Sequence, residues 1–383
     1  MRRTRIFTPG PTPVAPSAQL AMASPLVHHR KDEFRELLLE TRTHLQALFK
    51  TRNDVVILTA SGTGAMEAAV SNLLSSESRA LAVSAGKFGD RWVRICRAFN
   101  VPCDVLEKPY GEAASALEIQ RALEANPDIR ALLIQGCESS TATIHDLESI
   151  ARTVRSRCPG VLVVVDAITA LGSQPVETDA WGLDVVIGGA QKAFAIPPGL
   201  SFLSLSPRAL ETIRACPGPR FYFDLLKEVN GQRRGQTGLT PAVALVQALN
   251  RTSREMVDQG LDRILEQVEV RARCTRRGLE ALGFRQLSSA PANALTACFP
   301  PPGIDAARLI QHLQERFGIV VAGGQGVLKG KIIRIGHLGY FDLVDVFAVI
   351  SAIEICLLEL GAPVDLGAGI KAAMQAAVAP VFR

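Results

Sequence analysis

The sequence predicts an α/β protein with a large domain built on a mainly parallel, doubly wound sheet and a smaller C-terminal α+β domain. Short apolar runs alternate with helical patterns over the first two-thirds of the chain. The central runs are continuously apolar, which is typical of parallel strands covered on both faces by helices. The length of 383 residues leaves room for one large domain or two.

The elements follow from these patterns in chain order. We expect strands of the large sheet at 54–59, 79–84, 101–106, 129–135, 161–165, 184–187 and 199–205, with helices at 65–74 and 91–99. A helical pattern runs from 242 to 282 and ends at Gly283; after it we expect a strand at 293–299, a helix at 306–317, strands at 319–322 and 331–335, and a helix at 344–360. We therefore divide the chain into an N-terminal segment (1–20), a large domain (21–255) and a small domain (256–383).

Composition excludes several classes of protein. Apolar residues make up 48% and charged residues 21%, a balance typical of globular proteins. The net charge of +5 is small and the basic residues are dispersed, so we expect no nucleic-acid partner. The 8 cysteines form no CxxC pair and no close Cys/His spacing, so we expect neither a metal site nor a disulfide framework. No apolar stretch has the length of a signal peptide core or a membrane span, which predicts a soluble, cytoplasmic protein.

Three segments carry candidate chemistry, and the first is TASGTGAMEAA at 59–69. A strand that leads through a glycine-rich turn into a helix places free backbone N–H groups and the positive helix end together, which favours an anion such as phosphate. Such turns are also common without a ligand. A dinucleotide site is disfavoured because Glu67 occupies the third glycine position of that motif.

The second and third segments supply an acid and an amine. Asp166 directly follows the buried run 161–165, at the sheet edge where α/β proteins bind ligands. It could equally be a helix cap or turn residue, or hold a metal or a positively charged ring nitrogen. Lys192 lies in GGAQKAFAIPPG between two strands, and partial burial would make its amine a nucleophile toward aldehydes. A structural lysine is the alternative.

Together these segments match the needs of one cofactor, pyridoxal 5′-phosphate. The turn at 61–64 would hold its phosphate, Asp166 its ring nitrogen, and Lys192 its aldehyde as a Schiff base. Lys192 would then also be the base that moves the proton of the substrate's Cα. We therefore take Lys192 and Asp166 as the candidate catalytic residues.

The chain resembles the class V (fold-type I) aminotransferases, near the alanine–glyoxylate and serine–glyoxylate or serine–pyruvate branch. The resemblance runs over almost the full length, through these blocks in order: FTPGPTPV, HHRKDEF, SGTGAME, GKFGDRW, GCESSTAT, VVVDAITALG, GGAQKAFAIPPG, QTGLTPAV and IIRIGHLG. It implies a transaminase that moves an amino group from a small amino acid, such as alanine or serine, to a 2-oxo acid such as glyoxylate or pyruvate. It also implies a homodimer with shared active sites.

The resemblance further implies a role for particular residues. Ser61, Gly62, Thr63 and Gln191 would hold the phosphate, Phe88 would stack on the ring, and Ser139 would approach the ring's phenolic side. Gln236 and Thr237 would reach the phosphate of the neighbouring subunit. Arg334 would bind the substrate's carboxylate, and the turn around Gly10, in the 1–20 segment, would line the mouth of the pocket.

Two departures from the family pattern bear on substrate preference. Many relatives have tryptophan at the position of Phe88 and serine at that of Ala167.

Two other functions stay open. A lyase or cysteine desulfurase-like enzyme would use the same cofactor, but the flexible candidate segment at 323–331 contains no cysteine. A non-catalytic subunit of an enzyme complex is the third possibility, although such a subunit would not need Lys192, Asp166 and Arg334 together.

Overall fold

The larger part of the molecule is built on a seven-stranded sheet. The computed structural model describes residues 4–379 and confirms the predicted α/β class. The strand order is β2-β10-β9-β8-β5-β3-β4, and β10 alone runs antiparallel to its neighbours in this sheet. The strands are β2 (Asp54–Leu58), β3 (Arg79–Ser84), β4 (Cys103–Glu107), β5 (Ile129–Gln135), β8 (Leu162–Asp166), β9 (Val185–Gly189) and β10 (Ser201–Leu205). Each predicted strand is therefore present, with shifts of one to two residues at several ends.

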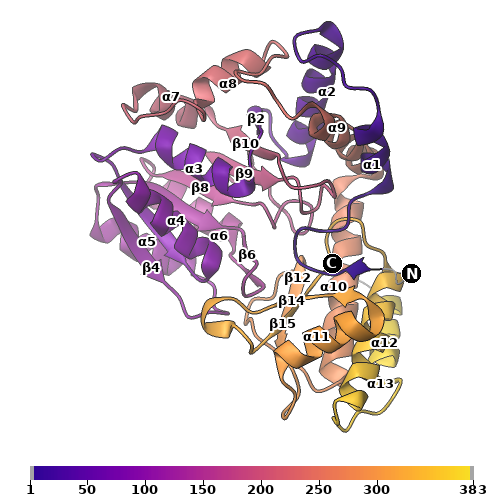
Figure 1. Ribbon diagram of the computed structural model, residues 1–383. Coiled ribbons are helices and arrows are strands. Elements are labelled where there is room, and N and C mark those ends of the chain that lie inside the picture. The colour runs from indigo at the N-terminus through magenta and orange to yellow at the C-terminus, as the bar shows by residue number, and fades with distance from the viewer. Residues whose placement is uncertain (1–3, 380–383) are drawn as a thin grey trace.

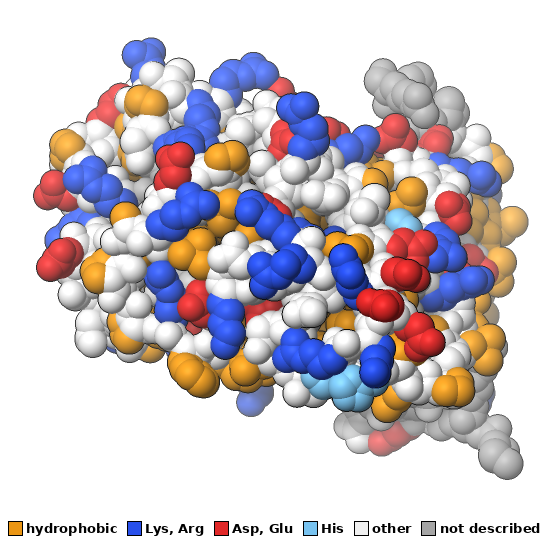
Figure 2. Space-filling model, turned by 90° about the horizontal axis from the view of Figure 1, so that it is seen from above, with side chains coloured by type: hydrophobic (Ala, Val, Ile, Leu, Met, Phe, Trp, Pro, Cys, Tyr) orange, Lys and Arg blue, Asp and Glu red, His pale blue; other side chains and the backbone are white. Residues whose placement is uncertain are grey.

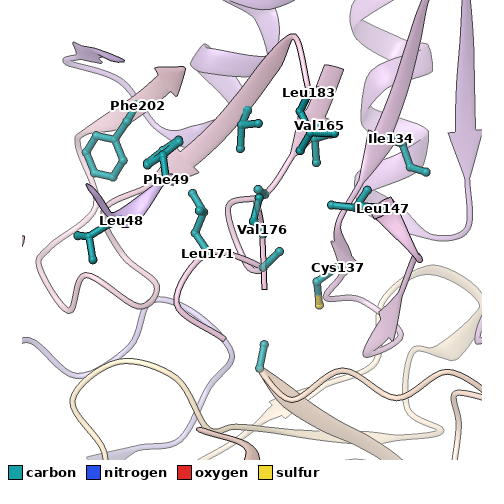
Figure 3. Close-up of a cluster of buried hydrophobic side chains, with 14 of the residues drawn as sticks. Leu48, Phe49, Ile134, Cys137, Leu147, Val165, Leu171, Val176, Leu183 and Phe202 are labelled. Carbon is teal, nitrogen blue, oxygen red and sulfur yellow. The ribbon is translucent and has the colours of Figure 1, made fainter. Parts of the chain in front are cut away.

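Helices cover both faces of this sheet, as the sequence predicts (Figure 1). Val163 and Val165 of β8 pack into one buried cluster, and Leu162 and Val164 pack into another on the opposite face. The first cluster, part of which is drawn in Figure 3, includes residues of α2 (Asp32–Leu48), α5 (Ala116–Ala125), α6 (Leu147–Arg157) and α9 (Val243–Gln259). The second includes residues of α3 (Gly62–Leu73), α4 (Lys87–Ala98), α7 (Pro207–Ala215) and α8 (Leu225–Gln232).

The smaller part has its own antiparallel sheet and hydrophobic cluster. Its strand order is β11-β12-β15-β14, formed by β11 (Arg285–Gln286), β12 (Leu295–Phe299), β15 (Ile333–Gly336) and β14 (Ala322–Gly323). Four helices accompany this sheet: α10 (Leu261–Ala281), α11 (Ala306–Phe317), α12 (Leu343–Glu359) and α13 (Ala368–Val378). The shorter elements elsewhere are β1 (Arg5–Ile6), α1 (Pro16–Ala23), β6 (Cys137–Glu138), β7 (Thr143–Ile144), β13 (Ile319–Val320) and the 3-10 turn η1 (Gly326–Leu328).

Two sequence predictions need correction. The helical pattern at 242–282 is two helices, because Gly260 has a φ of +85° and ends α9 before α10 begins. The expected strand at 319–322 is split between two sheets: β13 pairs in parallel with β1, whereas β14 joins β15. The domain boundary between 255 and 256, which lies within α9 about one turn before Gly260, stays a prediction.

The surface carries charges of both signs. In the view of Figure 2, Lys and Arg side chains are scattered over the face with Asp and Glu between them. No helix within 4–379 combines the length and the apolar character needed to cross a membrane.

Candidate active site

A cavity of about 210 Å³ brings together segments that are distant in the sequence. It lies where β8 and β9 end and where α3 and α4 begin, and residues 10 and 11 of the N-terminal segment also line it. The predicted site residues that line this cavity are Gly10, Ser61, Gly62, Thr63, Phe88, Asp166, Gln191 and Lys192. The cavity is thus at the sheet edge that the sequence indicates, and the separate motifs meet in it.

Lys192 is buried, with 8% of its surface exposed, and its Nζ donates a hydrogen bond to the Pro9 carbonyl at 2.8 Å. Burial lowers the pKa of this amine to about 8; Arg334 and Arg91 lower it as well, whereas Cys137 and Asp166 oppose the shift. A Lys192 side chain with this pKa is neutral in an appreciable fraction of molecules near neutral pH. It therefore has the nucleophilic form that capture of an aldehyde needs.

The N-terminal segment fixes the turn that carries Lys192. The Thr12 N–H donates to the Gln191 carbonyl at 3.1 Å, and Thr12 Oγ1 donates to the Lys192 carbonyl at 2.9 Å. Gly10 has a φ of +150°, and a Cβ at this position would overlap the end of the Lys192 side chain. Only glycine therefore allows the backbone to approach the amine so closely.

Asp166 is the last residue of β8 and is 5% exposed. Its Oδ1 accepts a hydrogen bond from the Ile168 N–H at 3.0 Å, so the carboxylate does support the turn, as the alternative interpretation expects. Its Oδ2 makes no hydrogen bond to any residue within 4–379. Burial raises the pKa of Asp166 to about 6; Glu138 raises it further, and the Ile168 N–H, Arg91 and Lys192 lower it. A buried carboxylate with a free oxygen suits a positively charged partner.

The start of α3 has the features of an anion site. Ser61 is the N-cap of α3, but its side chain makes no capping hydrogen bond, in contrast to Ser115 of α5 and Asp146 of α6. A Cβ on Gly62 would overlap Ile168. Across the cavity, Gln191 Oε1 is buried without a hydrogen-bond partner among the described residues. The free N–H groups at the start of α3, the Ser61 hydroxyl and the NH2 group of Gln191 can donate to a bound phosphate, whereas Gln191 Oε1 is an acceptor and needs a donor.

Two residues that the sequence analysis did not single out organise the other wall. Glu138 is fully buried, and its Oε2 accepts hydrogen bonds from the N–H groups of Phe88 and Gly89, both at 2.9 Å. Arg91, one turn after Phe88, also lines the cavity and donates to Thr63 Oγ1 at 2.8 Å. Glu138 lies in the block GCESSTAT and Arg91 in the block GKFGDRW, both of which carry the family resemblance. Their place in these blocks is the sequence feature that could have identified them as site residues.

Arg334 and Ser139 are connected to each other beside the cavity and are not among its lining residues. Arg334 Nε donates to the Gly323 carbonyl at 2.8 Å, and its Nη1 donates to the Ser139 carbonyl at 2.7 Å. Burial lowers the pKa of the Arg334 guanidinium. Its Nη2 makes no hydrogen bond within the described part of the chain, so it is available for a ligand.

Gln236 and Thr237 lie outside this cavity. Gln236 lines a separate depression of about 240 Å³ with residues such as His29 and Arg35. Thr237 Oγ1 donates to the Leu239 carbonyl at 2.7 Å, and its own carbonyl accepts from Arg30 at 3.0 Å. Their expected role in a neighbouring subunit's site stays a prediction.

Cys137 also lines the cavity. Burial raises the pKa of its thiol, with Glu138 adding to the increase, so the thiol stays protonated. This thiol is therefore poorly suited to nucleophilic attack.

The residues present fit pyridoxal phosphate. The free N–H groups at the start of α3 suit its phosphate, and the free Asp166 oxygen suits its protonated ring nitrogen. Lys192 suits its aldehyde, and Phe88 presents an aromatic ring to the same cavity.

Comparison with known proteins identifies the family of this chain. The family described as aminotransferase class-V matches residues 18–339. The small subunit of a soluble hydrogenase from a Synechococcus strain is 38% identical, over 97% of this chain and 98% of its own. The L-aspartate–glyoxylate aminotransferase of Paracoccus denitrificans is 30% identical, over 97% of this chain and 95% of its own. The crystal structure of a subgroup IV aspartate aminotransferase from Thermus thermophilus has a TM-score of 0.87 at 34% identity, covering 93% of this chain and 99% of that one. The chain belongs to the class-V aminotransferase family.

Proposed function

We propose that this protein is a pyridoxal phosphate-dependent transaminase that moves an amino group from a small amino acid, such as alanine or serine, to glyoxylate or pyruvate. The observation that carries the proposal is the convergence of Lys192, Asp166 and the free start of α3 on one cavity of about 210 Å³. A scaffold protein has no need of a buried amine with a lowered pKa opposite a buried carboxylate.

Each residue has a distinct part in this function. When bound, pyridoxal phosphate supplies an aldehyde that captures amino groups and a ring that takes up electrons from the substrate's Cα. Lys192 would hold the aldehyde and would serve as the base that moves the proton of the substrate's Cα. Asp166 would keep the ring nitrogen protonated, and Phe88 would provide an aromatic surface for the ring. Arg334 would bind the substrate's carboxylate through Nη2. Its Nε and Nη1 already donate to backbone carbonyls, which hold the guanidinium in position and leave Nη2 free.

The donor and acceptor are proposed from relatives. The Paracoccus relative is named for aspartate and glyoxylate, and the Thermus structure for aspartate. Aspartate is therefore tested beside alanine and serine, with glyoxylate and pyruvate as acceptors. We also propose a homodimer in which Gln236 and Thr237 complete the phosphate site of the partner.

Two other functions make different predictions. A cysteine desulfurase needs a reactive thiol, and Cys137, the cysteine that lines the cavity, has a raised pKa. The soluble hydrogenase name of one relative favours a subunit of an enzyme complex, which would not need to bind the cofactor.

The test is a set of half-reactions with the purified, cofactor-loaded protein. Each amino acid is added alone while the absorbance of the cofactor is followed, and each 2-oxo acid is then added to reverse the change. We expect alanine, serine or aspartate to convert the spectrum and glyoxylate or pyruvate to restore it. Sulfide release from cysteine without any 2-oxo acid would instead support a desulfurase. A protein that takes up no cofactor would support a non-catalytic subunit.

A further inference from the structure

The charges around the cavity are unevenly matched to a phosphate group. Phosphate monoesters carry about −1.5 to −2 charges at neutral pH, whereas a helix N-terminus supplies only about half a positive charge. Among the residues that line the cavity, Lys192 and Arg91 are the cationic ones. The proposed function assigns the Lys192 amine to the aldehyde, which leaves Arg91 as the fixed positive charge.

Arg91 is held in a defined position on the wall formed by α4. It follows Phe88 by three residues, so both side chains lie on the same face of the helix. The Arg91 guanidinium carbon lies 4.6 Å from the centroid of the Phe88 ring, a cation–π contact. Its Nη1 donates to Thr63 Oγ1 at 2.8 Å, which ties the start of α4 to the first turn of α3.

The remaining donors of Arg91 are available. A guanidinium has five N–H donors, and one side-chain hydrogen bond from Arg91 is formed within 4–379. Arg91 makes no salt bridge with a carboxylate in this part of the chain; the salt bridge at the start of α4 is formed by Lys87 and Asp90. Asp166 of the same cavity interacts electrostatically with Arg91 without forming a direct ion pair, so the remaining donors of Arg91 stay free beside the start of α3.

We propose that Arg91 is a phosphate-binding residue of this site, which contacts the cofactor's phosphate from the α4 side together with Thr63. This inference rests on the proposed function, because it requires that the cofactor binds. It adds a charged side chain to a phosphate site that otherwise consists of backbone N–H groups, hydroxyls and the Gln191 amide.

The test compares binding of pyridoxal phosphate with binding of pyridoxal, which lacks the phosphate. Both are titrated into the full-length protein after removal of its cofactor, for the wild type, Arg91→Gln, Arg91→Lys and Arg94→Gln. Arg94 is the matched control because it lies on the same helix and is exposed. For Arg91→Gln we expect pyridoxal phosphate to bind about 10- to 100-fold more weakly, the loss typical of a hydrogen bond to a charged group. Pyridoxal affinity should change by less than about twofold, since no phosphate contact is lost.

Two further variants, the charge-retaining Arg91→Lys and the exposed control Arg94→Gln, test whether the loss is specific to the Arg91 guanidinium. Arg91→Lys should keep part of the preference for pyridoxal phosphate, because it keeps the charge but not the planar donor geometry. Arg94→Gln should bind both compounds as the wild type does. Thermal unfolding of each cofactor-free variant checks that the fold is retained.

Two outcomes would overturn the inference, and a third would refute the proposed function on which it rests. Equal weakening of both compounds by Arg91→Gln would assign Arg91 to supporting Phe88 rather than binding phosphate. Unchanged binding of both, with a raised KM for aspartate relative to alanine, would assign it to a substrate carboxylate. A wild-type protein that binds neither compound would instead refute the proposed function itself, which separates that failure from failure of the Arg91 role.

Discussion

Polar side chains at the edge of the seven-stranded sheet and in the four-stranded sheet differ in how far their hydrogen-bonding atoms have partners. At the edge of the seven-stranded sheet, Asp166 keeps one oxygen without a hydrogen bond and Gln191 Oε1 is buried without a partner, both with respect to residues 4–379. In the four-stranded sheet and just after it, Arg334 is fixed by two carbonyls. His337 uses both ring nitrogens, with Asn293 and Thr296.

Asp166 and Gln191 each leave an acceptor oxygen without a partner, whereas Arg334 is held in position by two hydrogen bonds and keeps only Nη2 free. Unsatisfied buried polar atoms cost free energy and are uncommon unless a ligand or water completes them. In the proposed function the edge of the large sheet therefore carries the cofactor-binding and reactive groups, whereas the small sheet contributes one preoriented cation, Arg334. For His337, burial lowers the pKa to about 3, so this ring stays neutral and structural.

Removal of the Lys192 amine at the edge of the large sheet is expected to have the largest effect on activity. Lys192→Ala should reduce kcat by at least about 10²–10⁴-fold, the range for a lost general base. Steady-state kinetics measure the effect, and thermal unfolding verifies the fold. Lys371→Ala, at an exposed position of α13, is the matched control. Turnover by Lys192→Ala close to that of the wild type would refute the mechanism.

A smaller effect is expected from the preoriented cation. Arg334→Ala should raise KM about 10- to 100-fold, since the substrate carboxylate loses a charged hydrogen-bond partner. Arg334→Lys should recover part of this loss because it retains the charge. The measurement is the initial rate over a range of amino acid concentrations. If KM does not change in Arg334→Ala, the residue serves only to join β14 and β15 to the Ser139 segment.

The lowered pKa of Lys192 predicts how cofactor capture depends on pH. The neutral amine is the reactive form, so its fraction falls as pH decreases below the pKa of about 8. The rate of pyridoxal phosphate uptake by the cofactor-free protein should therefore rise about tenfold per pH unit up to about 8 and then level off. Stopped-flow absorbance at a series of pH values measures it. A rise that continues to the ordinary lysine pKa of about 10.4 would show that burial does not perturb this amine.

The smallest effect concerns the wall that Phe88 presents. Phe88→Trp should tighten pyridoxal phosphate binding about two- to fivefold, because a larger aromatic ring stacks over more of the pyridine. Phe88→Leu should weaken binding by a similar factor. Equilibrium titration of both variants measures the difference, and identical affinities would show that residue 88 does not stack on the ring.

Much of the cavity could be predicted from the sequence because its main residues lie at the ends of strands and the starts of helices, which local patterns reveal. Asp166 ends a buried strand and Ser61 begins a helix after one, so topology alone places both at the same sheet edge. Lys192 is conspicuous because its neighbours are apolar. In such cases the chemical role and the local pattern lie in the same few residues.

The features that were missed depend on contacts between distant segments. Glu138 acts on the start of α4 about 50 residues earlier in the chain, and Arg91 reaches Thr63 from a different helix. Neither contact leaves a periodic signal. The division of 319–322 between two sheets depends on pairing with residues 5–6, which no local propensity can indicate. The break at Gly260, in contrast, was readable, because glycine is a common helix stop.

The N-terminal segment has a mechanical consequence for the whole molecule. Its β1 is hydrogen-bonded to β13 of the smaller part, whereas Thr12 and Ala15 are hydrogen-bonded to the turn around Lys192 in the larger part. Any rotation of one part against the other must therefore strain residues 5–15, of which Gly10 and Pro11 line the cavity, or break one of these two sets of hydrogen bonds. As long as both sets of hydrogen bonds persist, a change at the cavity entrance is coupled to a change in the relative position of the two parts.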